Sequence, residues 1–389
     1  MRRLLILACA VVFLDVTFFS ILTPLLPSYQ DDHGLSDGAA GILAGSFAAG
    51  ALVFAIPAGW LVARIGARTT VVIGLVGIGI CSPVFGFADS IVMLDLLRFL
   101  QGGAGALMWA GAIAWVVVSA PVERRGEMLG IVIAAAVAGE LLGAPLGAVA
   151  HAIGTEIVFS TVLLAAAILI AVALGIPGAT DVESQPLSDA WRRIKRSDVP
   201  NAVLMLAGPS VAFGLAVVVG PLHMDDLGAS PFLIAAAFAA GSIVEVVIGP
   251  VIGRISDRVG RTLPYLAGVA TMTLAVIGLG VFGLLPLMFG AVMLLAFGAG
   301  IAFTPASTLV TDHASAAGVN QGYASGASNM AWGGGQMLGA VGGGALAGAY
   351  GYLLPCLVTA ALLIAVGLLA RSLGIGPPVT AGASEEAGS

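Results

Sequence analysis

Long apolar runs separated by short polar breaks are the main pattern along the chain. The breaks leave segments of about 20 residues or more, the length at which a helix crosses a hydrocarbon core of about 30 Å. These segments cover residues 4–27, 38–62, 69–88, 91–118, 127–151, 155–176, 200–222, 231–254, 262–283, 286–311, 319–347 and 351–371. The pattern predicts an all-α polytopic membrane protein with twelve transmembrane helices.

The composition excludes an ordinary soluble domain. Hydrophobic residues make up 59% of the chain and charged residues only 9%, whereas soluble domains carry about 25% charged residues. The 3 cysteines and 4 histidines are scattered, so we expect no disulfide, no metal site and no cofactor. The sequence contains no nucleotide-binding loop and no soluble enzyme domain. We therefore expect a protein that is not an enzyme and is driven by an ion gradient.

Basic residues alternate strongly between the loops. With the N-terminus inside, 14 of the 15 Lys and Arg residues fall in inner segments, and the remaining one, Arg98, lies within the fourth apolar segment. An excess of Lys and Arg marks cytoplasmic loops. We therefore predict a multi-pass protein of the cell (inner) membrane with both termini in the cytoplasm.

A polar stretch between the sixth and seventh apolar segments divides the chain. We predict an N-terminal six-helix bundle at 1–177, a cytoplasmic linker at 178–199, a C-terminal six-helix bundle at 200–372 and a disordered tail at 373–389. In the linker, SDAWRRIKRSD is compatible with an amphipathic helix on the inner face or with a basic tether, and we favour the tether.

The loops after the second and eighth segments, GWLVARIGART and GRISDRVGRT, share a pattern of Gly and Arg. A repeated six-span unit is typical of transporters built from two related bundles. The second loop closely resembles the cytoplasmic loop signature of the major facilitator superfamily, and the first, with Ala63 in place of Asp, resembles it less closely. The resemblance implies a gate motif of Gly59, Arg64, Gly66, Gly253, Asp257, Arg258, Gly260 and Arg261. We expect Asp257 to pair with a nearby Arg or to cap a helix.

Three further segments resemble the same superfamily, so that the likeness covers essentially the whole chain. RFLQGGAGA, with Arg98 and Gln101, resembles its fourth-helix motif. GELLGAPLGAVAHAIG resembles the fifth-helix motif of its antiporters through Gly139, Gly143, Pro145 and Gly147. The first segment is similar to the vesicular monoamine transporters and bacterial drug:proton antiporters through Leu14, Asp15, Pro24 and Pro27. The resemblance implies two pseudo-symmetric six-helix bundles around a central cavity.

Ionisable residues inside the apolar segments are candidate functional positions, because a charge near the bilayer centre costs at least about 2.5–3.5 kcal/mol. They are Asp15, Asp95, Arg98, Glu140 and Glu245. Asp15, Glu140 and Glu245 are each candidates for binding protons or substrate, or for a structural hydrogen bond. Asp95 and Arg98 are three residues apart on one helix face, so they form an ion pair or take part in proton coupling.

A stripe of polar and aromatic residues runs along the eleventh segment. It consists of Ser325, Asn329, Trp332 and Gln336, at spacings that place them on one helix face. We expect this face to line an aqueous cavity. Phe18 or Phe19 and Trp109 either add an aromatic wall to that cavity or pack against lipid or core.

The leading hypothesis is a proton-coupled efflux antiporter for lipophilic, cationic small molecules. We expect it to act as a monomer on a small-molecule substrate, with protons and the bilayer as partners and no nucleic acid. One alternative is efflux of sugars or other neutral solutes, which Glu245 and Asn329 would suit. Another is a non-transporting sensor on a transporter scaffold, which the loss of the Asp at position 63 would suit.

Overall fold

In a computed structural model, the described residues are 1–121, 124–178 and 185–373. All regular structure in these ranges is helical. The helices are α1 (Arg2–Ser20), η1 (Thr23–Leu25), α2 (Leu26–His33), α3 (Asp37–Ile65), α4 (Ala67–Gly86), α5 (Ile91–Ser119), α6 (Arg125–Ile153), α7 (Thr155–Leu174), α8 (Leu187–Lys195), α9 (Val199–Asp226), α10 (Pro231–Val259), α11 (Thr262–Val281), α12 (Leu285–Ala316), α13 (Gln321–Tyr350) and α14 (Leu353–Ser372). Nearly all of the predicted tail, 374–389, lies outside the described ranges.

Within the described ranges, twelve helical segments are long enough to cross a membrane, as the apolar pattern predicts. Eleven of them are also strongly apolar, the first being α1, η1 and α2 taken together as Arg2–His33. The twelfth is α13, whose 30 residues are rich in Gly. It packs between α3 and α9. Because α13 contacts other helices on two sides, it needs less apolar surface than a helix surrounded by lipid.

The first transmembrane segment is interrupted, although the sequence indicates one continuous apolar run. The α-helix ends at Ser20, a 3₁₀ turn follows at Thr23–Leu25, and α2 continues to His33. Pro24 and Pro27 cause the interruption, because proline has no backbone N–H to donate to the carbonyl four residues earlier. The tighter turn leaves carbonyl groups of α1 available to other partners.

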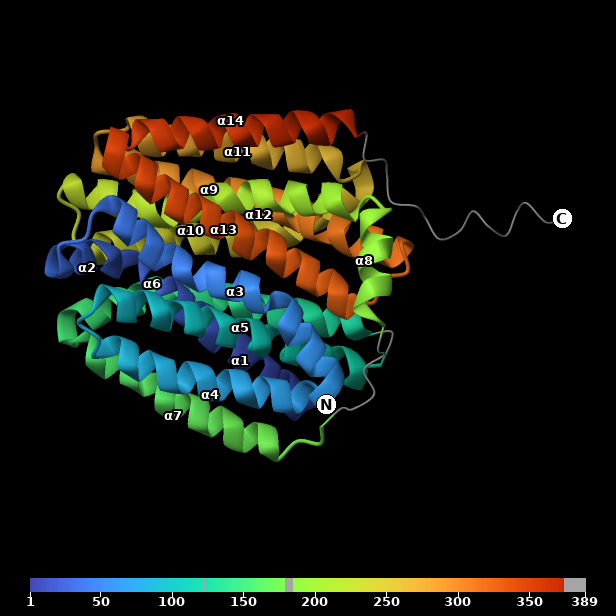
Figure 1. The fold of residues 1–389 in the computed structure, drawn as a ribbon. Helices are drawn as coiled ribbons and strands as arrows, with labels where there is room; N and C mark the ends of the chain where they lie inside the picture. The colour runs from blue at the N-terminus through green and yellow to red at the C-terminus, as the bar shows by residue number, and fades with distance from the viewer. Residues whose placement is uncertain (122–123, 179–184, 374–389) are drawn as a thin grey trace.

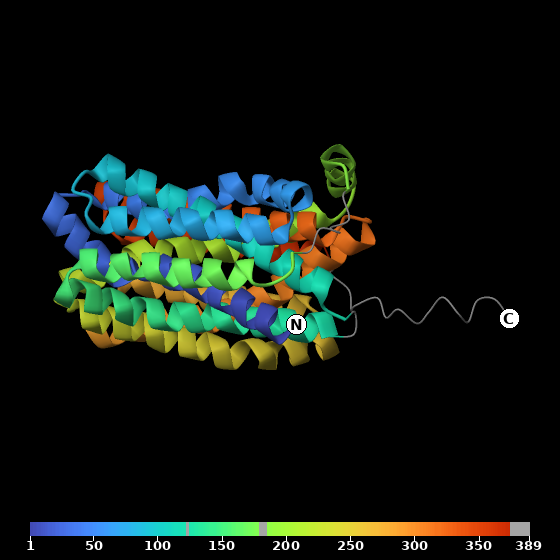
Figure 2. The ribbon, with the colours of Figure 1, turned by 90° about the horizontal axis from the view of Figure 1, so that it is seen from below.

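The long helices run side by side, and the two halves of the chain occupy opposite sides of the molecule (Figure 1). In that view α1 and α3–α7 lie below, and α9–α12 and α14 lie above. The N-terminus and the end of α14 lie at the end of the molecule that also carries α8, as Figure 2 shows from below for the N-terminus. We call it the arginine-rich end, because Arg64, Arg124, Arg254 and Arg371 stand at helix ends there. Contacts between the halves are made chiefly by α3 with α13 and by α6 with α10.

Close backbone contact joins α3 to α13. A Cβ atom added at Gly41 would lie 2.5 Å from the carbonyl oxygen of Ala340 and 3.0 Å from the Cα of Gly344. Only glycine fits at such a distance without moving a helix. The small residues that make the eleventh predicted segment weakly apolar therefore allow it to pack tightly between the two halves.

Residues 187–195 of the linker form helix α8, so the amphipathic helix rather than the favoured tether is observed. In Figure 1, α8 stands across the ends of the long helices. Ala190 is fully buried against Ala314, Val319 and Ala324 of the second half. The helix is thus packed against the second half at the arginine-rich end.

Candidate functional site

Asp15 lies on α1 and is buried, with 4% of its surface exposed. Its Oδ2 accepts a hydrogen bond from the indole Nε1 of Trp109 at 2.9 Å. Its Oδ1 has no hydrogen-bond partner among the described residues. Gly105 of α5 makes room for this carboxyl group, because a Cβ atom there would overlap Oδ1. The structure therefore presents a buried carboxylate that is held on one oxygen and open on the other.

Arg98 is also buried, with 1% of its surface exposed, but it does not pair with Asp95. Its Nη1 donates to the carbonyl of Phe18 at 2.9 Å, and its Nη2 donates to the carbonyl of Phe19 at 3.3 Å. The expected Asp95–Arg98 ion pair is therefore absent from the described residues, and Asp95 Oδ1 has no partner there. Arg98 binds these carbonyls because α1 ends early. The C-terminal end of a helix has free carbonyl groups and a partial negative charge, and both attract the guanidinium.

Arg98 and Gln101 are hydrogen-bonded to each other, as their position on one helix face suggests. Arg98 Nη1 donates to Gln101 Oε1 at 3.1 Å, and Gln101 Nε2 donates to Ser82 Oγ of α4 at 3.3 Å. The guanidinium also lies over the ring of Phe47, 4.9 Å from its centroid. This network joins α1, α3, α4 and α5 near Asp15, and Arg98 interacts electrostatically with Asp15.

Aromatic contacts link the first half to the stripe on α13. The ring of Phe19 lies 5.2 Å from that of Phe47 and 5.4 Å from that of Trp332. Phe18 instead packs against Phe159 in the first half. Trp109 holds Asp15 through its indole N–H. Of the aromatic residues considered from the sequence, Phe19 and Trp332 are thus the ones at the contact between the halves.

A small void of about 10 Å³ lies beside these groups. Its lining residues are Phe19, Leu22, Thr23, Leu26, Ala44, Arg98 and Val217. Val217 belongs to α9, so both halves contribute to the lining. Such a volume corresponds to about one water molecule. The space between the halves is therefore closed around Arg98 in this conformation.

The stripe on α13 is only partly buried. Gln336 has 2% of its surface exposed, and its Nε2 has no hydrogen-bond partner among the described residues. Trp332 meets Phe19, whereas Ser325 and Asn329 are half-buried. The stripe therefore runs from a closed region at Gln336 toward a more accessible region at Ser325.

Glu140 and Glu245 come from different halves, on α6 and α10, and lie close enough to interact electrostatically. The carboxyl group of Glu140 is hydrogen-bonded to the Ser242 hydroxyl. That hydroxyl donates to the Phe238 carbonyl at 3.1 Å. A serine hydroxyl has a single hydrogen, so Ser242 donates either to the Phe238 carbonyl or to an ionised Glu140. Spacing in the sequence gives no sign that these two acids meet.

The antiporter-like glycines of α6 pack against α1. A Cβ atom at Gly139, Gly143 or Gly147 would press against backbone of α1, near Phe13, Thr17 and Ile21 respectively. Pro145 lies inside α6 between these contacts. The motif thus places α6 directly against the helix that carries Asp15, within the first half of the molecule.

The two gate-motif loops have the same backbone form. Gly66 follows α3 with φ 85° and ψ 156°, and Gly260 follows α10 with φ 85° and ψ 165°. Both have the positive φ that favours glycine. Gly59 and Gly253 lie within the preceding helices, and Arg64 stacks on Trp60. The equal geometry supports the internal repeat inferred from the sequence.

An ion pair at the second loop involves a residue outside the predicted motif, and the predicted role of Asp257 is untested. Arg261 Nη1 lies 2.7 Å from Asp312 Oδ2 of α12, which joins the loop to a neighbouring helix. Arg258 is exposed, and the Asp257 side chain lies outside the described residues. Asp312 is missing from the sequence-based set of candidates. The sequence feature that could have identified Asp312 is its position directly after the apolar segment 286–311, at the same end as the motif.

Comparison with known proteins agrees with this architecture. The model of the Major Facilitator Superfamily matches residues 8–327. The MFS-type transporter ppzB of Metarhizium majus is 28% identical over 172 residues, which are 43% of this chain and 37% of that protein. Multidrug resistance protein 2 of Bacillus subtilis is 25% identical over 273 residues, which are 67% of this chain and 68% of that protein.

The chain thus matches only about a third of the length of the Metarhizium relatives. A solved structure gives wider coverage. The crystal structure of a bacterial homologue of the human lysosomal transporter Spinster, inward-facing and unoccupied, has a TM-score of 0.73 and 14% identity, covering 95% of this chain and 97% of that one. At this identity the likeness concerns the fold alone. Because the family model matches most of the chain, the protein belongs to the major facilitator superfamily.

Proposed function

We propose that this transporter is a proton-coupled antiporter that expels lipophilic, cationic small molecules by alternating access. The observation that carries the proposal is Asp15, a buried carboxylate with one oxygen held by Trp109 and the other without a partner. A proton and an organic cation both neutralise a carboxylate, so they compete for it. Such competition is the simplest way to exchange one for the other.

The surroundings of Asp15 suit a lipophilic cation. Phe19, Phe47 and Trp332 form an aromatic group that extends from the first half to α13. Aromatic faces attract cations and also contact the apolar parts of a substrate. The name of Multidrug resistance protein 2 of Bacillus subtilis supports a substrate of this class. In our proposal the void beside Arg98 widens as the halves move apart, and substrate then reaches Asp15.

We assign the coupling between the halves to Glu140 and Glu245. Two ionised carboxylates on α6 and α10 repel each other, whereas a proton on either removes the repulsion. We place the proton of this pair on Glu140, whose carboxyl group is hydrogen-bonded to the Ser242 hydroxyl. Loss of that proton would then favour separation of α6 from α10, and its return would favour their contact.

The decisive experiment measures the affinity of purified protein for a cationic dye against pH. Wild-type binding should weaken as pH falls, because protons neutralise the carboxylate that pairs with the dye. Asp15→Asn should bind about 10- to 100-fold more weakly at high pH, because a charged hydrogen-bonding partner is lost, and its binding should change little with pH. Glu140→Gln and Glu245→Gln should keep the affinity but lose proton-driven uptake into proteoliposomes.

Other outcomes would favour the alternatives. If Asp15→Asn keeps both the affinity and the pH dependence of the wild type, Asp15 is structural and the proposal fails. Uptake of sugars as efficient as that of cationic dyes would indicate a neutral-solute transporter. Absence of uptake for every dye and sugar under an imposed pH gradient would favour a sensor.

A further inference from the structure

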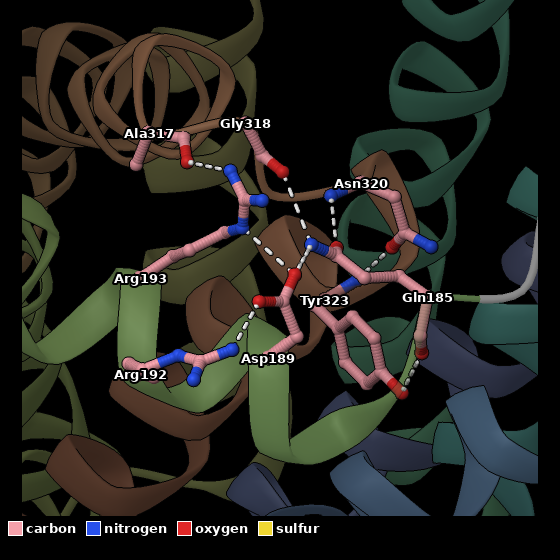
Figure 3. A network of polar contacts seen from close by, with 8 residues as sticks. All are labelled: Gln185, Asp189, Arg192, Arg193, Ala317, Gly318, Asn320 and Tyr323. Atoms are coloured by element: carbon pink, nitrogen blue, oxygen red, sulfur yellow. Dashed lines mark hydrogen bonds and ion pairs between the residues drawn. The ribbon is translucent and has the colours of Figure 1, made fainter.

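The linker between the halves is attached to the second half by hydrogen bonds at Gln185. Gln185 Nε2 donates to the Gly318 carbonyl at 3.1 Å, and its Oε1 accepts from the Asn320 backbone N–H at 2.9 Å. Its backbone carbonyl accepts from the Tyr323 hydroxyl at 2.9 Å. Figure 3 shows these bonds beside α8. Together with the burial of Ala190, they fix the position of α8 at the arginine-rich end.

Helix α8 has the form of a helix that lies at a membrane surface. It stands across the ends of the long helices (Figure 1), so it runs parallel to the plane of a membrane that these helices span. Trp191 is 51% exposed, and the Lys195 ammonium lies 4.8 Å from its ring centroid. Tryptophan and lysine in this arrangement are typical of the headgroup region.

A cavity of about 620 Å³ opens between α8, the start of α9 and the end of α12. Its lining residues are Asp189, Arg192, Arg193, Arg196, Ser197, Asp198, His313, Ala316 and Ala317. The arginines and aspartates among them leave an excess of one positive charge, 3 − 2 = +1. The cavity is therefore suited to an anion.

The three arginines are not equally engaged. Arg192 and Arg193 both pair with Asp189, at 2.8 Å each, and Arg193 also donates to the Ala317 carbonyl (Figure 3). Arg196 has no ion-pair partner among the described residues. Its guanidinium, and the outer donors of Arg192, thus remain free to bind phosphate oxygens, which arginine binds with paired hydrogen bonds.

We propose that this cavity binds the phosphate of an anionic phospholipid headgroup. The shared chemistry of phosphate would also allow a free phosphate ester to bind. The position of α8 favours the lipid, because Trp191 and Lys195 place the cavity at headgroup level. The acyl chains of the lipid would extend past Trp191 into the bilayer. The bound lipid would hold α8 at the membrane surface, against the end of the second half.

The test titrates the full-length protein in detergent with dioctanoyl phosphatidylglycerol by isothermal calorimetry. We expect saturable binding that Arg196→Gln weakens by about 10-fold or more, as loss of a charge-assisted hydrogen bond implies. Arg192→Gln provides a second variant with the same expectation. Arg371→Gln is the matched control, because Arg371 is an exposed arginine in the last turn of α14, outside the cavity. It should leave binding unchanged.

Two further ligands test which parts of the lipid the cavity recognises. Dioctanoyl phosphatidylcholine, which has no net charge, should bind at least about 10-fold more weakly than phosphatidylglycerol. Glycerol 3-phosphate, which has the phosphate but no acyl chains, should also bind more weakly. Equal binding of glycerol 3-phosphate would overturn the lipid assignment. Equal weakening by Arg371→Gln, or none by Arg196→Gln and Arg192→Gln, would overturn the site itself.

Discussion

Asp15 depends on neighbours that make space for it as much as on those that bind it. Trp109 supplies one hydrogen bond, Arg98 acts at longer range, and Gly105 leaves the volume that the carboxyl group occupies. An added methyl group at Gly105 would have to displace the carboxyl group or separate α5 from α1. The placement of one charged side chain is thus determined by the smallest residue on the facing helix.

We therefore expect Gly105→Ala to disturb the candidate site. Overpacking of this kind costs about 1–3 kcal/mol, so the melting temperature should fall. Binding of a cationic dye should fall as well, because Trp109 can no longer hold Asp15 in place. Gly290→Ala on α12 is the matched control, since nothing lies within 4 Å of a Cβ atom there. Unchanged dye affinity and melting temperature in Gly105→Ala would contradict this account of Asp15.

At the scale of elements, α8 is held by charges as well as by apolar burial. Asp189 accepts hydrogen bonds from Arg192, Arg193 and Gln185, and these partners, with Arg192 first, hold the pKa of its carboxyl group below its ordinary value. A lowered pKa in the folded state means that the carboxylate stabilises the docked helix above its unfolded pKa. That contribution is lost only as pH falls through the lowered value.

Hydrogen exchange of α8, corrected for intrinsic rates, should therefore show constant protection between pH 8 and pH 5. Asp189→Asn should exchange about two- to fivefold faster over this range, a modest effect because the ion pairs are partly exposed and screened. His313 and Asp198 also line the cavity, so the comparison with Asp189→Asn isolates the Asp189 contribution. Equal exchange rates in the two proteins would show that apolar contacts alone hold α8.

At the scale of the whole molecule, the N-terminus, the end of α14 and α8 share the arginine-rich end (Figures 1 and 2). From the distribution of Lys and Arg we predict that this end faces the cytoplasm. A fluorescent protein that folds only in the cytoplasm should therefore be bright when fused after Ser389. Alkaline phosphatase, which is active only outside, should be active when fused in the loop at Asp89 and inactive after Ser389. The reverse pattern would invert the topology.

The apolar pattern predicts the twelve spans within a few residues because each depends on local composition. Contacts between helices are harder to predict, since they depend on how each helix turns. Arg98 binds carbonyls of α1 instead of Asp95 because prolines break α1 early, and the apolar run conceals that break. The proximity of Glu140 to Glu245 depends on how α6 of one half packs against α10 of the other. Gln185 has no motif, so its role in holding α8 is visible only in three dimensions.

The linker is attached to the first half at one end and to the second half at the other. Trp115 Nε1 holds the Pro177 carbonyl to the first half at 3.2 Å, while Gln185 is held to the second half. These anchors are 185 − 177 = 8 residues apart, and a fully extended chain of that length reaches about 28 Å. As long as both anchors hold, they cannot move further apart than this length. Under the alternating access proposed above, the linker would thus set an upper limit on opening at the arginine-rich end.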